Sequence, residues 1–320
     1  DENVKLKLAN EKTPTGVAML LRNLGDEFNS EHTILRLQSE NDSKKYNACV
    51  LLSPGIEGVA GNAWHNIASQ LTLPTFITQL TKTINMESIE EIGQFLSNDV
   101  IENIFKGTEH FYLVGYSFGA FITLEMARLL EETGKHGQIL LIDGAPKFLH
   151  KLAIDQMSAN WTEESIQIVL IAGILNTIFP DETTDVLPII TECPTFESRI
   201  DKLLELAKDQ NIYSEGYLRM MTKALYNRIK ITLLTDVNCI KPLESPITLV
   251  RPTEVSVVDI EEDYGLSEYT TGTVSLKFLE GNHITMLENP KLTQIITESD
   301  PVLESDRSFQ KYLQSNVIAE

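Results

Sequence analysis

Ser117 lies between two glycines in a pattern that could make its hydroxyl a nucleophile. Gly115, Ser117 and Gly119 form the sequence Gly-x-Ser-x-Gly, in which a tight strand-to-helix turn raises the serine above a sheet. The turn also brings the hydroxyl to a helix N-terminus, where free N–H groups and the helix dipole favour a developing negative charge. The chemistry predicted for this turn is nucleophilic attack by Ser117.

The residues around Ser117 favour this interpretation over an ordinary turn with a capping serine. Residues 111–114 form a short, apolar, β-prone run before the turn. After it, apolar residues recur at helical spacing, at Ala120, Leu124, Ala127 and Leu130. Because glycine and serine are common in loops, the motif alone is a weak signal. The residues around it make the prediction specific.

A serine hydroxyl needs a base, and the base needs an orienting carboxylate. After such a turn the expected chain order is Ser, then Asp or Glu, then His. The six histidines are His32, His65, His110, His136, His150 and His283. The first three precede Ser117, the fourth falls at the wrong end of the predicted sheet, and the fifth opens a helical region. His283 follows the predicted strand 274–279 at the edge where open α/β sheets bind ligands, so we predict that it is the base.

Two positions compete for the carboxylate. Asp143 ends the apolar run 139–142, whereas Asp259 or Asp263 would follow a later strand, 247–250. Asp143 is also a residue type that forms turns before glycine. We favour Asp143 because an unpaired carboxylate at a buried strand end would be costly, while Asp259 belongs to an acidic, solvated run.

An oxyanion produced by attack of Ser117 would need two backbone N–H donors. One is expected from Phe118, directly after the nucleophile, and the other from the loop after an early strand. The loop Gly55-Ile-Glu-Gly is in the right place, so the N–H of Ile56 is the second candidate. A phosphate loop is a weak alternative, since the glycine spacing fits neither known pattern and no Lys-Ser/Thr follows.

The elements that would position these residues alternate between strand and helix as far as residue 146. This alternation predicts a mostly parallel central sheet with helices on both faces. Together with the Gly-x-Ser-x-Gly turn, it indicates the α/β-hydrolase fold. The core is expected at 46–146 and 244–313, with a helical lid at 147–243 whose main helices are 161–179, 196–208 and 214–234. Residues 1–45 are interpreted as a linker with an amphipathic island at 17–24, and 314–320 as a tail.

Composition excludes several classes of protein. The 320 residues carry a formal net charge of −20, which argues against nucleic acid and against an anionic membrane surface. No apolar run is long enough to span a membrane. The three cysteines are far apart, so neither a disulfide framework nor a metal site is expected, and a cytoplasmic setting fits best. The first residue is Asp1, and we expect the chain to be part of a longer protein.

Several separated motifs, in order, resemble the thioesterase domain at the C-terminal end of animal type I fatty acid synthases. They are Ser53-Pro-Gly-Ile-Glu-Gly, Gly115-Tyr-Ser-Phe-Gly-Ala, Leu141-Ile-Asp-Gly-Ala-Pro, Asp263-Tyr-Gly-Leu and Leu279-Glu-Gly-Asn-His. They span about residues 47 to 290, and 17–38 resembles the linker from an acyl carrier protein. The resemblance implies a triad of Ser117, Asp143 and His283, with Ile56 and Phe118 as oxyanion donors.

Three positions depart from that family. Ser53 stands where a histidine is usual, and Asn282 stands where an aspartate precedes the catalytic histidine. The loop after Gly55 also carries one extra residue, so the second donor could be Glu57 instead of Ile56. None of these changes removes a member of the triad.

The resemblance implies hydrolysis of long-chain fatty acyl thioesters, without a cofactor of the protein's own. The substrate would arrive on the phosphopantetheine of an acyl carrier protein in cis, within a homodimeric parent synthase. The candidates to line an acyl groove are Ile168, Ile171, Leu175 and Leu203. These four side chains could equally well pack against one another in the core of the lid. Two other functions stay open: a thioesterase that releases or cyclises peptides or polyketides, and an inactive hydrolase fold that serves as a binding module.

Overall fold

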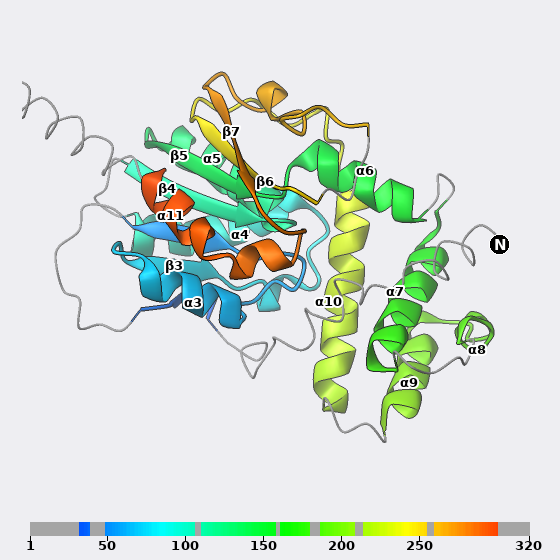
Figure 1. Ribbon diagram of the computed structural model, residues 1–320. Coiled ribbons are helices and arrows are strands. Elements are labelled where there is room, and N and C mark those ends of the chain that lie inside the picture. Colours follow the sequence, from blue (N-terminus) through cyan, green and yellow to red (C-terminus); the bar gives the residue numbers. More distant parts are fainter. Residues whose placement is uncertain are drawn as a thin grey trace, which may run out of the picture.

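The centre of the molecule is a sheet of seven strands (Figure 1), in the order β1-β3-β2-β4-β5-β6-β7. The computed structural model describes residues 32–38, 49–105, 110–157, 161–179, 186–208, 214–254 and 259–299. The strands are β1 (Ile34–Arg36), β2 (Val50–Ser53), β3 (Thr75–Thr78), β4 (His110–Tyr116), β5 (His136–Ile142), β6 (Ile247–Pro252) and β7 (Val274–Leu279). All neighbours are parallel except β1, which runs antiparallel to β3.

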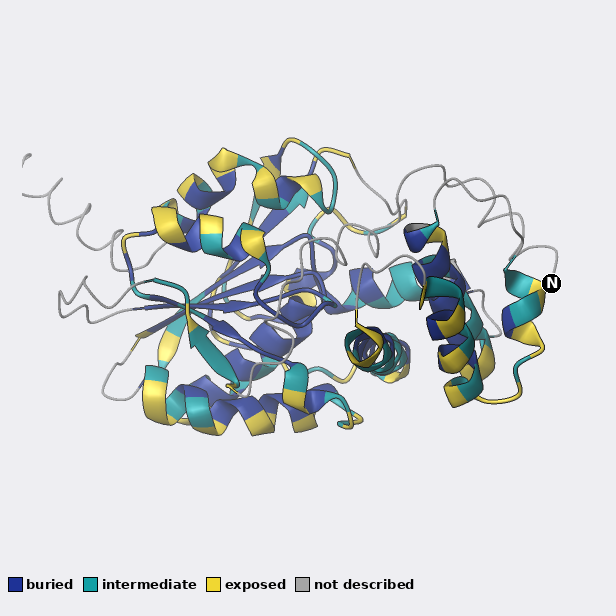
Figure 2. Cartoon of the chain, turned by 90° about the horizontal axis from the view of Figure 1, so that it is seen from below, coloured by how far each residue is buried: buried dark blue, intermediate teal, exposed yellow. Residues whose placement is uncertain are grey.

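Both faces of this sheet are apolar because its strands alternate between two buried clusters. Leu51 and Leu113 point to one face, with α4 (Ile89–Asp99) and α5 (Gly119–Glu132). Val50 and Val114 point to the other, with α3 (Asn62–Gln70) and α11 (Pro290–Glu298). Figure 2 shows the buried strands between two layers of helices. The predicted fold class, a mostly parallel sheet covered on both faces, is confirmed.

Between β5 and β6 the described chain is helical, and we call this part the lid. It contains α6 (Pro146–Met157), α7 (Glu163–Ile178), α8 (Leu187–Thr191), α9 (Phe196–Ala207) and α10 (Glu215–Leu234). The helices α7, α9 and α10 lie close to the ranges expected from the sequence, whereas α6 and α8 were not predicted. The long helix α10 stands between the sheet and the helices α7, α8 and α9 (Figure 1).

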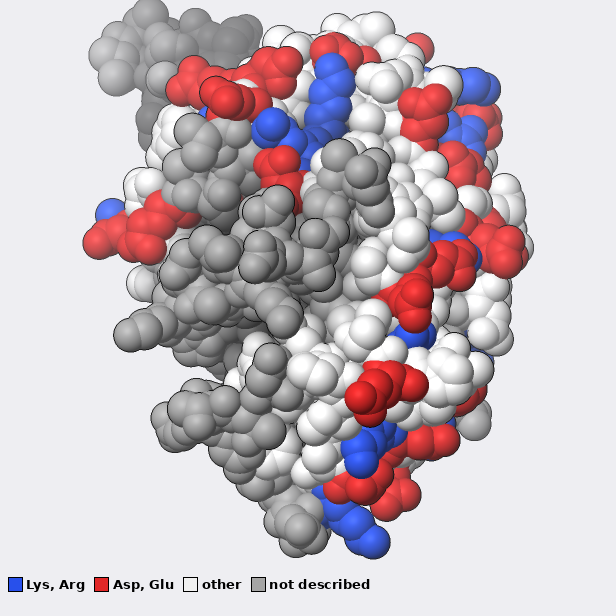
Figure 3. Space-filling view, turned by 90° about the vertical axis from the view of Figure 1, so that its right-hand side faces the viewer, with Lys and Arg blue, Asp and Glu red and all other residues white. Residues whose placement is uncertain are grey.

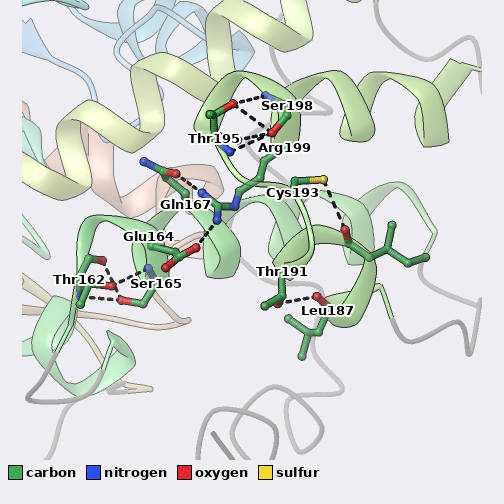
Figure 4. A network of polar contacts seen from close by, with 11 residues as sticks. Thr162, Glu164, Ser165, Gln167, Leu187, Thr191, Cys193, Thr195, Ser198 and Arg199 are labelled. Carbon is green, nitrogen blue, oxygen red and sulfur yellow. Dashed lines mark hydrogen bonds and ion pairs between the residues drawn. The ribbon is translucent and has the colours of Figure 1, made fainter.

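A buried arginine joins two lid helices at their N-terminal ends (Figure 4). Arg199 of α9 is 2% exposed, and its Nη1 donates to Oε1 of Gln167 on α7 at 2.7 Å. Its Nη2 donates to Glu164, also on α7. Because breaking such a pair leaves a buried charge alone, the network fixes how α7 and α9 align. The ends Thr162 and Thr195 both carry capping boxes closed by a serine at the third helical position.

The surface of the lid combines both signs of charge, which Figure 3 shows as neighbouring blue and red side chains. On α10, Arg219 bonds to Glu197 and Asp201, and Lys223 pairs with Glu197. Within the described residues, no helix is both long and apolar enough to cross a membrane.

The strand β1 was not expected, because its three residues lie in the range interpreted as a linker. A three-residue segment gives too little alternation to indicate a strand, and its pairing with β3 decides its structure. The amphipathic island at 17–24 and the tail at 314–320 lie outside the described residues, as do residues 300–313 at the end of the expected core.

Candidate active site

Ser117 occupies the sharp turn between β4 and α5. Its backbone has φ of 52°, a left-handed conformation that is strained for any residue but glycine. The backbone N–H of Ser117 donates to the carbonyl of Ile142 at 3.1 Å, which ties the turn to the next strand. The side chain is 8% exposed. The turn therefore holds the hydroxyl at the edge of the sheet, as the sequence pattern predicts.

The glycines on either side of Ser117 are required by close packing. A Cβ on Gly119 would lie 2.3 Å from the carbonyl oxygen of Ser53, and a Cβ on Gly115 would lie 2.4 Å from Oγ1 of Thr123. Backbone of β2 thus approaches the start of α5 too closely for any side chain. This contact brings the loop after β2 next to the serine turn.

The structure brings Ser117, His283 and Asp143 into one chain of hydrogen bonds. Nε2 of His283 lies 3.0 Å from Oγ of Ser117, and Nδ1 of His283 lies 2.7 Å from Oδ2 of Asp143. A neutral imidazole that donates from Nδ1 to the carboxylate leaves Nε2 free to accept the serine proton. The three residues come from the ends of β4, β5 and β7, which meet at the carboxyl edge of the sheet.

Asp143 is held at a buried strand end and is 1% exposed. Its φ is 41°, and its N–H donates to the carbonyl of Val250 on β6 at 2.8 Å. The two competing aspartates lie elsewhere. Asp259 is exposed, and Asp263 accepts the N–H groups of Gly265 and Ser267 within its own turn.

Tyr264 completes the surroundings of Asp143, and no role was predicted for it. Its hydroxyl donates to Oδ1 of Asp143 at 2.7 Å. Its ring stacks on Phe148 with centroids 4.1 Å apart, and the guanidinium of Arg251 lies 4.5 Å from the ring centroid on a cation–π contact. Burial and the neighbouring charge of Asp143 raise the pKa of Tyr264, so its O–H stays protonated and can donate.

Tyr116 supports His283 from the side and was also not predicted. The two rings stack with centroids 4.9 Å apart and planes 24° from parallel. The Tyr116 hydroxyl donates to the carbonyl of His283 at 2.9 Å. Burial, and then the charges of Glu57 and Asp143, raise the pKa of Tyr116. The sequence pattern shows Tyr116 only as a further residue of the apolar strand before the turn, so it contains no signal for this role.

The two N–H groups expected to hold an oxyanion lie on neighbouring segments. Gly58 donates its N–H to the carbonyl of Gly55 at 3.0 Å, which closes a turn with Ile56 and Glu57 at its centre. Oε1 of Glu57 accepts the N–H of Gly55 at 3.0 Å. Within the described part of the chain, the N–H groups of Ile56 and Phe118 have no acceptor.

Glu57 is buried inside this turn, with 6% of its surface exposed. Burial raises the pKa of its carboxyl, and the N–H groups of Glu57 itself and of Gly55, with the charge of Arg228, act in the opposite direction. The hydrogen bonds of the described residues do not separate Ile56 from Glu57, so the choice of the second donor stays a prediction.

The predicted groove residues lie in the core of the lid. Ile171, Leu175 and Leu203 are 0%, 1% and 0% exposed, and Ile168 packs against the same cluster. In this arrangement they contact one another, so an acyl chain could reach them only if α7 and α9 separate. Their assignment to a groove stays a prediction. Among the described residues, no group of His, Cys, Asp and Glu could hold a metal ion.

Comparisons with known proteins identify the family. A family model described as the thioesterase domain matches residues 49–301. A solved four-domain nonribosomal peptide synthetase matches with a TM-score of 0.62 and 16% identity over 83% of this chain. This chain covers only 20% of that synthetase.

Two shorter solved proteins match over nearly their whole length. The type II thioesterase BorB of the borrelidin cluster has 18% identity and a TM-score of 0.56, over 84% of this chain and 97% of its own. The thioesterase domain of Vlm2 has 20% identity and a TM-score of 0.51, over 82% and 94%. At these identities the likeness shows the fold, which is the predicted α/β-hydrolase fold. With the family model covering most of its length, the chain belongs to the thioesterase domain family.

Proposed function

We propose that this protein is a serine-dependent thioesterase that releases an acyl chain from a carrier protein. The observation that carries the proposal is the chain of hydrogen bonds from Ser117 through His283 to Asp143, within a thioesterase fold. The resemblance of the sequence to the thioesterase of a fatty acid synthase agrees on the reaction, and family membership supports a thioester as substrate.

Each residue of the site has a step in this reaction. Nε2 of His283 takes the proton of Ser117 while Oγ attacks the thioester carbon, and Asp143 stabilises the imidazolium that forms. The N–H groups of Ile56 and Phe118 hold the oxyanion. When the C–S bond breaks, His283 returns its proton to the leaving thiolate. A water molecule, activated by His283, then attacks the acyl-serine ester and releases the free acid.

For the acyl chain, we favour a peptide or polyketide product over a fatty acid. The solved proteins that resemble this chain include the thioesterase of the borrelidin cluster, one from the yersiniabactin peptide and polyketide pathway, and a peptide synthetase. One of these is a nonribosomal peptide synthetase and another belongs to a combined nonribosomal peptide and polyketide pathway, which supports the same class of substrate here. The carrier would present its cargo on a phosphopantetheine arm, and a carrier in the same chain would act at an effective concentration of about mM.

A fatty acyl chain is the second candidate, and one observation favours it. The buried side chains of the lid cluster are aliphatic apart from Met221, and they include Ile171, Ile174 and Leu203. Each methylene buried there would contribute about 0.8 kcal/mol. A polar peptide gains nothing comparable from such a surface, so an opened lid would select for an alkyl chain.

Carrier-loaded substrates test the function and separate the two candidates. Wild type and Ser117→Ala are assayed with a carrier protein loaded with long-chain fatty acyl, peptidyl and β-hydroxyacyl groups. We expect turnover by wild type alone, with kcat/KM highest for the peptidyl or β-hydroxyacyl group. A preference for the fatty acyl group would establish the second candidate. Equal rates for both proteins, or no turnover of any thioester by wild type, would contradict a serine-dependent thioesterase and leave the binding module as the remaining candidate.

A further inference from the structure

Arg228 reaches from lid helix α10 into the loop that follows β2. Its guanidinium donates from Nη1 to the carbonyl oxygens of Ile56 at 2.6 Å and Glu57 at 2.8 Å. Nη2 donates to the carbonyl of Leu80 at 2.9 Å. The residue is 2% exposed, and burial lowers its pKa to about 10, which the charge of Glu57 opposes. A cation placed at this cost against three carbonyls needs an explanation beyond stability.

The bonds of Arg228 continue through the turn to the expected oxyanion donor. Nη1 binds the carbonyl of Glu57, which shares a peptide unit with the N–H of Gly58. That N–H donates to the carbonyl of Gly55, which in turn shares a peptide unit with the N–H of Ile56. Hydrogen bonds in such a chain polarise one another, so the guanidinium strengthens and orients the N–H of Ile56.

The loop is shaped to receive this side chain. Gly58 has φ of +70°, and a Cβ added to it would lie 2.4 Å from Nη2 of Arg228. The guanidinium therefore occupies the space that any other residue would fill at this position. The next residue, Val59, is 0% exposed and belongs to the apolar cluster of the lid. The turn thus packs on the lid as much as on the sheet.

The geometry points to Arg228 as a positioning residue of the oxyanion hole, carried by the lid rather than by the hydrolase core. The inference rests on the proposed function for the role of Ile56. It implies that the lid and the oxyanion hole form one unit. A movement of α10 that admits an acyl chain would then also move the N–H of Ile56, so catalytic competence would depend on the state of the lid.

Substitutions on one helix test this role. Arg228→Met keeps a long unbranched side chain and removes its hydrogen-bond donors. Arg228→Lys keeps the charge but loses the planar, forked arrangement of N–H donors. Arg219→Met is the matched control, since Arg219 lies on the same helix at the surface and pairs with Glu197 and Asp201. We expect Arg228→Met to lower kcat about 10- to 100-fold, somewhat less than removal of an oxyanion donor, with little change in KM. Arg228→Lys should fall between Arg228→Met and wild type, and Arg219→Met should match wild type.

A transition-state analogue separates positioning from a general loss of structure. An alkyl trifluoromethyl ketone adds to Ser117 and forms an oxyanion in the same place. Its affinity should fall by the same factor as kcat in Arg228→Met. Binding of the substrate thioester, measured in a Ser117→Ala background, should stay within about twofold. A kcat for Arg228→Met equal to that of Arg219→Met would overturn the inference while leaving the proposed function standing.

Hydrogen exchange gives a readout that needs no activity. In Arg228→Met the amide of Gly58 should exchange faster than in wild type, while the amides within α5 keep their protection. Unchanged exchange at Gly58 would overturn the inference whether or not the protein hydrolyses thioesters. Absence of turnover by wild type would instead contradict the proposed function. If Arg228→Met does not fold, Arg228→Lys and its exchange at Gly58 decide.

Discussion

Tyr264 donates its phenolic O–H to Oδ1 of Asp143, and the two oxygen atoms lie 2.7 Å apart. Since His283 occupies Oδ2, both oxygens of this buried carboxylate have a partner. Tyr264 itself has φ of 59°, so its backbone is strained and is held in place by the stacking with Phe148 and Arg251. The loop before β7 thus fixes the orientation of the carboxylate that orients His283.

We therefore expect Tyr264→Phe to lower kcat about 10- to 100-fold, because a hydrogen bond to a charged group is worth about 1.5–3 kcal/mol. KM should change little, since Tyr264 does not face the substrate. Loss of the O–H leaves one oxygen of a buried carboxylate without a hydrogen-bond partner. Steady-state kinetics of Tyr264→Phe and wild type with one thioester measure the change.

Tyr269→Phe is the matched control for this substitution. Tyr269 is 2% exposed, against 1% for Tyr264, and its O–H donates to the carbonyl of Val237 at 2.9 Å. Both variants lose one buried hydrogen bond, but only one of these bonds reaches the triad. Parallel losses of kcat in the two variants would show that Tyr264 acts through stability alone.

The three hydrogen-bonded residues could be predicted from the sequence because each meets a separate physical requirement. The flanking glycines select Ser117, the order along the chain selects His283, and the end of a buried strand selects Asp143. Tyr264 and Arg228 leave no such signal. The role of Tyr264 depends on a left-handed backbone in a loop, and that of Arg228 on contact with a turn 171 positions away in the chain. Periodicity in the lid predicts burial correctly, but it does not say whether the buried partner is protein or substrate.

The choice of Asp143 over Asp259 gives a second prediction. Asp143→Asn should lower kcat by about 10⁴-fold, as loss of the carboxylate does in serine hydrolases with such a triad, because the amide favours the wrong tautomer of the histidine. Asp259→Asn should keep wild-type rates, since Asp259 is exposed. Steady-state kinetics with one thioester compares the two. Near-normal turnover by Asp143→Asn would contradict the assignment.

The close packing at the serine turn gives a third prediction. Gly119→Ala should destabilise the protein by at least about 1–3 kcal/mol, the usual range for overpacking, because the new Cβ meets backbone oxygen atoms of β2. Gly173→Ala is the control. A Cβ there meets nothing within 4 Å, and the change should stabilise helix α7 by about 0.5–1 kcal/mol. Denaturant titration of both variants measures these differences, and a Gly119→Ala protein as stable as wild type would contradict the packing.

The buried carboxyl of Glu57 gives a prediction on pH and stability. Its pKa in the folded protein is raised above the ordinary value of 4.5, chiefly by burial. Between those two pKa values the folded state binds more protons than the unfolded state, so stability falls as pH rises through this window. Glu57→Gln removes this titration and still offers an acceptor to the N–H of Gly55. The stability of Glu57→Gln relative to wild type should therefore increase with pH above about 4.5 and level off above the folded pKa.

Glu90→Gln, at an exposed position of α4, is the control, and urea titrations from pH 4 to 8 measure the difference. A constant difference between Glu57→Gln and wild type across that range would show that Glu57 has the same pKa in the folded and the unfolded protein, and it would contradict a pKa raised by burial.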